Sequence, residues 1–211
     1  MFITFEGVEG AGKSTAIRGV AASLEARGAK VLLTREPGGS GLGRELRRLL
    51  LGTSMDLDPL AELCLFLADR AQHVARIIRP ALARGEIVLC DRYADSTIAY
   101  QGFARGLDVE RLVTLNDIAT GSLVPDLTLV LDLPVEEGLA RVAARRADAG
   151  ADEEGRIDAE TVSFHEAVRR GFHRIAADEP GRVRLIDSRP PKETVLAACL
   201  AEIDRPGLFS A

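Results

Sequence analysis

Residues 2–15 read FITFEGVEGAGKST and place the pattern G-x-x-x-x-G-K-S on Gly7, Gly12, Lys13 and Ser14. A short apolar run, residues 2–5, precedes the pattern, and apolar residues at helical spacing follow it. A strand, a glycine loop and a helix in this order are typical of a phosphate-binding loop. The context favours that loop over the alternative, an ordinary glycine-rich turn.

The chemistry of such a loop follows from its residue types. Glycines let the backbone curl so that several N–H groups point at phosphate oxygens, and the next helix adds partial positive charge at its N-terminus. Lys13 is suited to the β- and γ-phosphates and the Ser14 hydroxyl to Mg²⁺. The sequence therefore predicts that ATP or another nucleoside triphosphate binds with Mg²⁺ through Gly7, Val8, Glu9, Gly10, Ala11, Gly12, Lys13, Ser14 and Thr15.

Length and composition indicate one α/β domain, residues 1–211. The net charge of −5 argues against a general nucleic-acid-binding protein. No apolar run reaches the length of a membrane span, and the chain begins with a strand pattern rather than a signal peptide. Three cysteines, Cys64, Cys90 and Cys199, stand alone in apolar stretches, which predicts buried thiols in a reducing cytosol.

Strand and helix patterns alternate along the chain. Strands are predicted at residues 2–5, 30–34, 86–90, 127–133 and 182–186, and helices after residue 13 and at 42–50, 59–84, 94–103, 108–120, 135–146, 158–177 and 193–203. Residues 148–155 read as a mobile loop. Such alternation predicts a doubly wound, five-stranded parallel sheet, whose ligands bind at the carboxyl ends of the strands. The loops expected there are 7–14, 35–41, 91–97 and 133–134.

Asp91 follows four apolar residues, which is the form of a Walker B strand. Beside a phosphate loop we favour a Mg²⁺-holding role for Asp91, together with Ser14, over a role as a helix cap. Arg92 comes next, and its guanidinium suits a phosphate group; the alternative is a surface salt bridge.

Further candidate residues lie on the long helix and near its neighbours. Phe66, Arg70 and His73 share one face at helical spacing. Arg70 alone reads as either a ligand contact or a solvated or paired side chain, and His73 as a packing or hydrogen-bonding residue. Three arginines precede the acidic segment 148–155 and one follows it (Arg141, Arg145, Arg146 and Arg156), which is consistent with a lid or with a solvated segment.

Several motifs together resemble those of bacterial thymidylate kinases. They are FEGVEGAGKST at residues 5–15, TREPGG at 34–39, DRY at 91–93, AYQG at 99–102, PDLT at 125–128 and FHEAVRRGF at 164–172. The resemblance covers about residues 2–195 in order, and the combination is far more specific than the phosphate loop alone. It implies a P-loop nucleoside monophosphate kinase fold and transfer of the γ-phosphoryl group of MgATP to thymidine monophosphate (dTMP), giving dTDP for dTTP biosynthesis. It also implies a cytoplasmic homodimer formed through the long helices.

The resemblance also implies roles for individual residues. Glu9 and Tyr100 lie by the sugar, Phe66 stacks on the thymine, Arg70 hydrogen-bonds it, and Arg92 binds the acceptor phosphate. The remaining substrate-binding positions are Glu36, Pro37, Thr97 and Gln101, and Arg189, Pro190 and Pro191 lie where the family contacts adenine. Segment 145–156 corresponds to the lid, with Gly155 where many relatives carry an acid. The expected catalytic set is Lys13, Arg92, Arg145, Arg156 and Glu9.

A catalytic arginine is expected to meet the charge that develops on the transferred phosphoryl group. The variable phosphate-loop positions, 8–11, hold no basic residue. We therefore predict that the lid supplies this arginine, with Arg145 or Arg156 ahead of Arg146, and Arg141 too far back on its helix.

Three other functions are weighed against this one. Another nucleoside monophosphate kinase would share the phosphate loop without needing Arg70, Tyr100 and Gln101 together. A switch GTPase would carry an N-K-x-D motif, but none of the three lysines follows an asparagine. A DNA-associated ATPase would need a basic patch, which the acidic balance does not favour.

Overall fold

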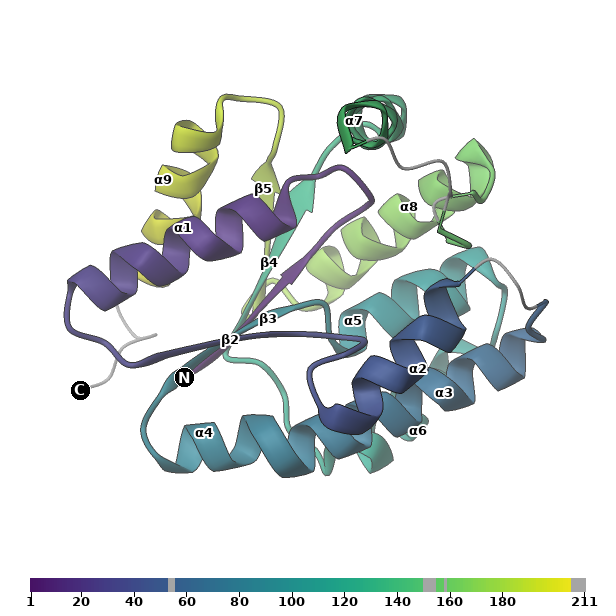
Figure 1. The fold of residues 1–211 in the computed structure, drawn as a ribbon, viewed down its shortest axis with the longest axis horizontal. Helices are drawn as coiled ribbons and strands as arrows, with labels where there is room; N and C mark the ends of the chain where they lie inside the picture. The colour runs from purple at the N-terminus through teal and green to yellow at the C-terminus, as the bar shows by residue number, and fades with distance from the viewer. Residues whose placement is uncertain (53–55, 150–154, 158, 206–211) are drawn as a thin grey trace.

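The computed structural model describes residues 1–52, 56–149, 155–157 and 159–205. Within them a parallel sheet has the strand order β2-β3-β1-β4-β5 (Figure 1). The strands are β1 (Phe2–Glu6), β2 (Val31–Arg35), β3 (Ile87–Asp91), β4 (Leu127–Asp132) and β5 (Val183–Asp187). Each strand end lies within one residue of its predicted position, so the predicted five-stranded parallel sheet is confirmed.

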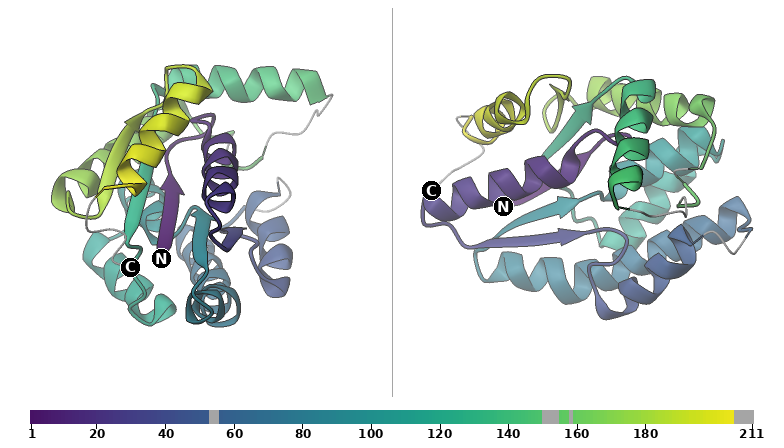
Figure 2. Two further views of the ribbon diagram at one scale, coloured as in Figure 1. Left: turned by 90° about the vertical axis from the view of Figure 1, so that its left-hand side faces the viewer. Right: turned by 45° about the horizontal axis from the view of Figure 1, so that its top comes forward.

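Helices cover both faces of this sheet. Their bounds are α1 (Lys13–Ala26), α2 (Gly41–Leu51), α3 (Pro59–His73), η1 (Val74–Ile78), α4 (Arg79–Ala83), α5 (Ala94–Thr97), η2 (Ile98–Ala104), α6 (Val109–Thr120), α7 (Val135–Ala149), α8 (Val162–Asp178) and α9 (Lys192–Ile203). Helices α1 and α9 pack together on one side of the sheet, and α8, α6 and the α3–α4 helix lie on the other (Figures 1 and 2). The helix that follows β1, α1, thus lies on one face of the sheet, whereas α6, which follows β3, lies on the other. A crevice therefore opens at the carboxyl ends of β1 and β3.

The predicted long helix exists, but its middle is π-helical. Helix α3 passes into the π-helical η1 and then into α4 without a break. Its start is the predicted one, because the Asp58 side chain caps the helix by accepting a hydrogen bond from Leu60 N at 2.8 Å. Residues 94–104 form a second such helix, in which most residues belong to the π-helical η2.

Three expectations from the sequence are corrected. Helix α8 begins at Val162 rather than 158, because Thr161 caps it by accepting from Phe164 N. Helix α7 continues to Ala149, into the segment predicted as a loop, and residues 150–154 of that segment lie outside the described residues. Cys64 is exposed, unlike Cys90 and Cys199, because it stands on the side of α3 turned away from the core.

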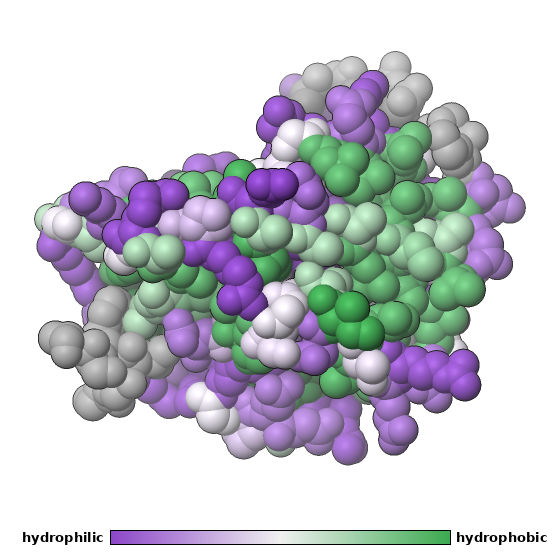
Figure 3. All heavy atoms as spheres, turned by 90° about the horizontal axis from the view of Figure 1, so that it is seen from below, coloured by the Kyte–Doolittle hydropathy of each residue, from purple (hydrophilic) through white to green (hydrophobic). Residues whose placement is uncertain are grey.

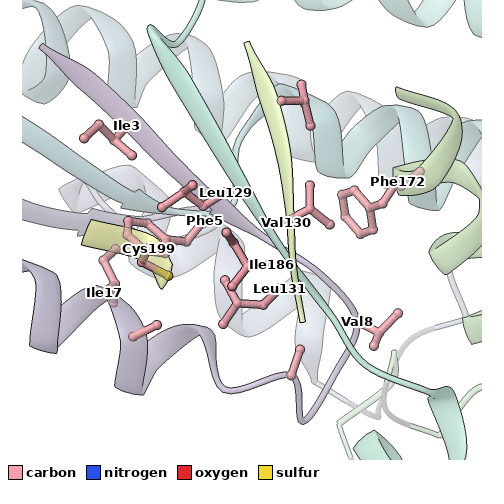
Figure 4. Packing of buried hydrophobic residues seen from close by; sticks show 14 of the residues in the cluster. Ile3, Phe5, Val8, Ile17, Leu129, Val130, Leu131, Phe172, Ile186 and Cys199 are labelled. Atoms are coloured by element: carbon pink, nitrogen blue, oxygen red, sulfur yellow. The ribbon is translucent and has the colours of Figure 1, made fainter. Parts of the chain in front are cut away.

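The core that supports the crevice is built on both faces of the sheet. Figure 4 shows Val130 of β4 beside Phe172 of α8, while Ile17 of α1 lies near Cys199 of α9 on the other face. All five residues of β1 are buried, as expected for a central strand. Each large apolar side chain removed from water contributes roughly 1.5–3 kcal/mol. The phosphate loop therefore leaves the sheet from a strand that is buried along its whole length.

Candidate active site

A cleft of about 460 Å³ lies at the carboxyl ends of the strands. It is lined by most of the predicted site residues: Glu9, Gly10, Gly12, Lys13, Ser14, Thr15, Glu36, Pro37, Phe66, Arg70, Asp91, Arg92, Thr97, Tyr100, Gln101 and Arg145. The predicted loops 7–14, 35–41 and 91–97 all contribute to it. Of the remaining predicted positions, Gly7, Val8, Ala11, Arg156 and the loop 133–134 do not line this cleft among the described residues.

The phosphate loop is held open by glycine geometry and by its lysine. Gly10 and Gly12 have φ angles of 73° and 88°, in the left-handed region that favours glycine. Lys13 donates to the carbonyl oxygens of Gly7 at 3.0 Å and Val8 at 2.9 Å, so its ammonium group sits inside the loop. Burial lowers the pKa of Lys13 to about 8, which leaves the ammonium group protonated at neutral pH.

Ser14 and Asp91 come together across the cleft as the sequence predicts. The Ser14 hydroxyl donates to Asp91 Oδ2 at 3.0 Å, joining the start of α1 to the end of β3. The N-cap position of α5 is Tyr93, so the Asp91 side chain is turned to Ser14 rather than to the next helix. Two hard oxygen donors beside a phosphate loop fit Mg²⁺, which is held by one or two protein oxygens plus substrate phosphates. Within the described residues no cluster of three or more His, Cys, Asp or Glu side chains could hold a metal by itself.

Glu9 is the centre of a buried hydrogen-bond network at the mouth of the loop. Its Oε1 accepts from Arg92 at 2.8 Å and from the Tyr100 hydroxyl at 2.6 Å, and its Oε2 lies 3.0 Å from His165 Nδ1. Burial raises the pKa of Glu9, but Arg92, His165 and Lys13 outweigh it and bring the pKa down to about 2. Glu9 is therefore a carboxylate at neutral pH, fixed by three side chains.

Arg92 itself sits in an uncommon backbone conformation. Its φ angle of 71° lies in the left-handed region, which costs a residue with a side chain on the order of 1–3 kcal/mol. Its backbone N–H donates to Phe5 O at 2.9 Å, and its guanidinium lies over the Tyr100 ring at 4.9 Å. These contacts direct the guanidinium into the cleft rather than to the surface.

Arg70 is fully buried, and four contacts fix its guanidinium. It donates to Glu36, Thr97, Asn116 and the carbonyl of Tyr93, at 2.8, 2.7, 2.6 and 2.9 Å. The sequence left open whether Arg70 is a ligand contact or a paired side chain. The guanidinium is paired within the protein and also lines the cleft, where a ligand could reach it. It does not lie on a solvated surface.

His73 forms hydrogen bonds, as one of its two predicted readings requires. Its Nδ1 lies 2.9 Å from Glu36 Oε1, and its Nε2 lies 2.6 Å from Thr34 Oγ1. The residue is buried and does not line the cleft. His73 therefore holds Glu36 in place through the carboxylate oxygen that Arg70 does not bind.

The arginines near the lid occupy different environments. Arg145 on α7 lines the cleft. Arg156 instead donates to Leu50 O at 3.0 Å and forms an ion pair with Glu62. The structure thus brings Arg145, but not Arg156, to the cleft. Away from the cleft, Arg141 donates to Ser188 O, and Arg189 pairs with Asp187.

Comparison with known proteins agrees with this geometry. The model of the thymidylate kinase family matches residues 5–198. The chain belongs to the thymidylate kinase family. The thymidylate kinase of Desulfovibrio desulfuricans is 57% identical over 206 residues, which cover 97% of this chain and 95% of the relative. That of Nitratidesulfovibrio vulgaris is 59% identical over 196 residues, covering 92% and 91%. The crystal structure of thymidylate kinase from Ehrlichia chaffeensis has a TM-score of 0.77 at 35% identity and covers 97% of this chain and 98% of that one.

Membership of the thymidylate kinase family confirms the fold class predicted from the sequence, a P-loop nucleoside monophosphate kinase with a parallel sheet. None of the helices in the described part of the chain is long and apolar enough to cross a membrane.

Sequence reasoning missed several residues of this thymidylate kinase site. Arg18 and Arg47 line the cleft although they lie outside the predicted loops, and Arg35 and Ser96 line it from the predicted loops 35–41 and 91–97, in which neither was assigned a role. Glu62 could have been found, because it stands four residues before Phe66 on the helical face that carries Phe66 and Arg70.

Glu6 is a second missed acid. It carried a signal of its own, since a charged residue inside a buried strand needs partners. Its carboxyl accepts from Tyr93 N at 2.7 Å and from Ser96 Oγ at 2.5 Å. Glu6 therefore supports the loop that carries Arg92.

Proposed function

We propose that this cleft binds MgATP and dTMP side by side and transfers the γ-phosphoryl group of ATP to dTMP, giving dTDP for dTTP synthesis. Family membership supports the reaction. The observation that carries the proposal is that one cleft joins the phosphate loop to the acceptor residues Arg70, Tyr100 and Gln101. The cytoplasmic location implied by the family resemblance remains part of the prediction.

The charge of the cleft suits two phosphorylated ligands. Its described lining holds seven basic side chains, Lys13, Arg18, Arg35, Arg47, Arg70, Arg92 and Arg145, against the three acids Glu9, Glu36 and Asp91. The whole chain has a net charge of −5, so positive charge is concentrated here against the overall balance. A cleft of this kind attracts anionic substrates and lowers the cost of bringing their phosphates together.

The donor side is formed by the phosphate loop and the start of α1. Backbone N–H groups of the loop and the positive end of the helix face the same space. Lys13 would exchange its carbonyl partners for phosphate oxygens. Ser14 and Asp91 are the residues that would hold Mg²⁺, which when bound neutralises charge on the β- and γ-phosphates.

On the acceptor side we assign a different side chain to each part of dTMP. Arg92 is positioned for the acceptor phosphate, and Glu9 with Tyr100 for the sugar. Phe66, Arg70, Thr97 and Gln101 surround the space left for the base. Little covalent chemistry falls to the protein, because aligning two anions and excluding water accounts for most of the catalysis of phosphoryl transfer.

Arg145 is the lid arginine that the geometry favours for catalysis. It already lines the cleft, whereas Arg156 is held by Glu62 and Leu50. Negative charge spreads over the transferred phosphoryl group in the transition state, and an arginine beside it strengthens its contact there.

We also propose that the protein works as a homodimer formed through its long helices. Leu60 on α3 and Val113 and Ile118 on α6 are 58%, 55% and 71% exposed. Figure 3 shows apolar residues gathered on the face seen from below in Figure 1, where α3, α4 and α6 lie. A second copy covering this face would remove the apolar residues from water. Sedimentation equilibrium tests the proposal, and a monomer across micromolar concentrations would contradict it.

The reaction is tested by a coupled assay of ADP release with a panel of nucleoside monophosphates. We expect dTMP to give the highest kcat/KM. Preference for a purine monophosphate would replace the proposal with the related kinase considered above.

A further inference from the structure

Glu62 is a buried acid beside the cleft for which the proposed reaction has no use. Its side chain is 1% exposed and does not line the cleft. Glu62 Oε1 accepts from Gln101 Nε2 at 2.8 Å. Arg105 approaches both carboxylate oxygens at 3.4 Å, and Arg156 forms an ion pair with Oε2. A buried acid with this many donors holds its partners in defined orientations.

The contact with Glu62 fixes which end of the Gln101 amide faces which way. Burial raises the pKa of Glu62, but the contacts with Gln101, Arg105 and Arg156 lower it by a larger amount. The pKa of Glu62 therefore lies below the ordinary value of a glutamate. An ionised carboxylate only accepts hydrogen bonds. The NH₂ group of Gln101 must therefore face Glu62, because the flipped amide would place two acceptors in contact. The carbonyl oxygen of Gln101 is left on the other side.

That carbonyl oxygen is available to a ligand. Gln101 lines the cleft, and no donor within the described residues bonds its Oε1. Arg70 lies in the same cleft with four of its N–H groups bonded to protein. Because a guanidinium has five N–H groups, one donor remains on Arg70. The base pocket thus offers an acceptor on Gln101 and a donor on Arg70.

We propose that Glu62 is a positioning residue that sets the polarity of the Gln101 amide, so that the pocket selects a pyrimidine with a hydrogen-bond donor at N3. Thymine carries N3–H as a donor and O4 as an acceptor, which complements Gln101 and Arg70. Cytosine carries an acceptor at N3 and an amino donor in place of O4, which opposes both. The inference rests on the proposed function, and it predicts selection against cytidine nucleotides through a residue that does not touch the base.

The carboxylate of Glu62 is held in place from two directions. Arg105 follows η2, the helix that carries Gln101, and also pairs with Glu160 at 2.7 Å. Arg156 is the last residue of the proposed lid segment, and its backbone N–H donates to Leu51 O at 3.2 Å. The Glu62 carboxylate therefore cannot move aside to make room for a flipped Gln101 amide, whose carbonyl oxygen would then face it. A freely rotating amide would satisfy N3 of thymine and N3 of cytosine alike, whereas an anchored one favours N3–H of thymine.

The test compares kcat/KM for dTMP and dCMP in wild type and in Glu62→Gln. The variant keeps the size of the side chain but can both donate and accept, so either orientation of Gln101 becomes possible. We expect the dTMP to dCMP ratio to fall by about tenfold or more, as the loss of one enforced hydrogen bond predicts. The KM for ATP should stay unchanged.

Arg105→Gln is the matched control, because it weakens the same buried cluster while Arg156 still anchors Glu62 and Glu62 still binds Gln101. It should lower the melting temperature and leave the ratio unchanged. An equal fall in the ratio for this variant would show that general loosening, rather than amide polarity, is responsible and would overturn the proposal. So would an unchanged ratio in folded Glu62→Gln.

If Glu62→Gln fails to fold, Glu62→Asp takes its place. Aspartate keeps the charge but withdraws the carboxylate by one methylene, so the ratio should narrow in the same direction, and an unchanged ratio would overturn the proposal. Failure of the proposed function is distinguishable, because the wild type would then not phosphorylate dTMP at all.

Discussion

Arg70 joins the recognition of the acceptor to the packing of the site. It reaches the cleft and also binds Glu36, Thr97 and Asn116. Arg70→Ala should raise KM for dTMP by more than tenfold, since a lost buried hydrogen bond costs roughly 1–3 kcal/mol, while KM for ATP changes little. Steady-state kinetics with each substrate varied in turn measures both constants. Equal increases in the two would show that Arg70 acts only on structure.

Glu6 makes stability depend on pH. Burial raises the pKa of this carboxyl to about 7, from 4.5 in an exposed chain. Between pH 4.5 and about 7 the folded protein keeps a proton on Glu6 that the unfolded chain has lost. Glu6 therefore lowers the free energy of unfolding as pH rises through this range. Relative to wild type, Glu6→Gln should gain on the order of 2 kcal/mol between about pH 5 and pH 8. Urea unfolding at several pH values measures the difference, and a constant difference contradicts the raised pKa.

The sequence identified site residues best where a local pattern was enough. Lys13, Ser14 and Asp91 stand in motifs whose geometry is set by the adjacent strand and helix. Glu9 and His165 are brought together from positions 156 residues apart, and nothing local signals that contact. The partners of Arg70 likewise come from several elements, so only the family resemblance placed that residue in the site.

At the scale of elements, helix α7 lies directly on the phosphate loop. A Cβ atom on Gly138 would overlap the carbonyl oxygen of Glu9, and one on Gly10 would overlap the carbonyl oxygen of Gly138. Gly138→Ala should push α7 away from the loop and lower kcat by on the order of tenfold to 100-fold, because small misplacements are costly in phosphoryl transfer. Gly181→Ala is the control, since a Cβ there meets nothing within 4 Å. Normal kcat in both variants would show that the close approach has no part in catalysis.

The same helix carries the arginine expected to act in the transition state. Arg145→Ala should lower kcat by on the order of 10³ with little change in KM, and lysine should rescue it only in part. Arg156→Ala should mainly lower the melting temperature, because Arg156 is bound to Glu62. Single variants at positions 145, 146 and 156 and the triple variant test this in steady-state kinetics. A triple variant with kcat within about threefold of wild type, less than 1 kcal/mol, would rule out a lid arginine.

Element types were predictable, but their local geometry was not. Apolar spacing indicated helices at 59–84 and 94–103, yet η1 and η2 are π-helical. A π-helical turn shifts the direction of later side chains without changing the apolar pattern that reveals a helix. Tyr100 and Gln101 lie in η2, so their orientation toward the cleft follows from tertiary contacts, such as those with Glu9 and Glu62.

At the scale of the whole molecule, the alternation of strands and helices was enough to predict the sheet. Parallel strands buried on both faces read as apolar runs, and short connections leave few arrangements open. The order β2-β3-β1-β4-β5 then places the ends of β1 and β3 beside each other, which brings the phosphate loop to Asp91 and Arg92. The arginines at positions 18, 35 and 47 also line the cleft, but no local sequence pattern marks them as site residues, because tertiary structure brings them together.

Transfer of the phosphoryl group can be followed with ATP labelled at its γ-phosphate. We predict that the wild-type protein with Mg²⁺ moves the label from ATP to dTMP and forms labelled dTDP. Lys13→Ala should do so at least about 100-fold more slowly, because the loop loses its cation. Lys30→Ala, an exposed lysine outside the cleft, should match the wild type. Label released only as inorganic phosphate, or transferred to another monophosphate in preference to dTMP, would contradict the proposed reaction.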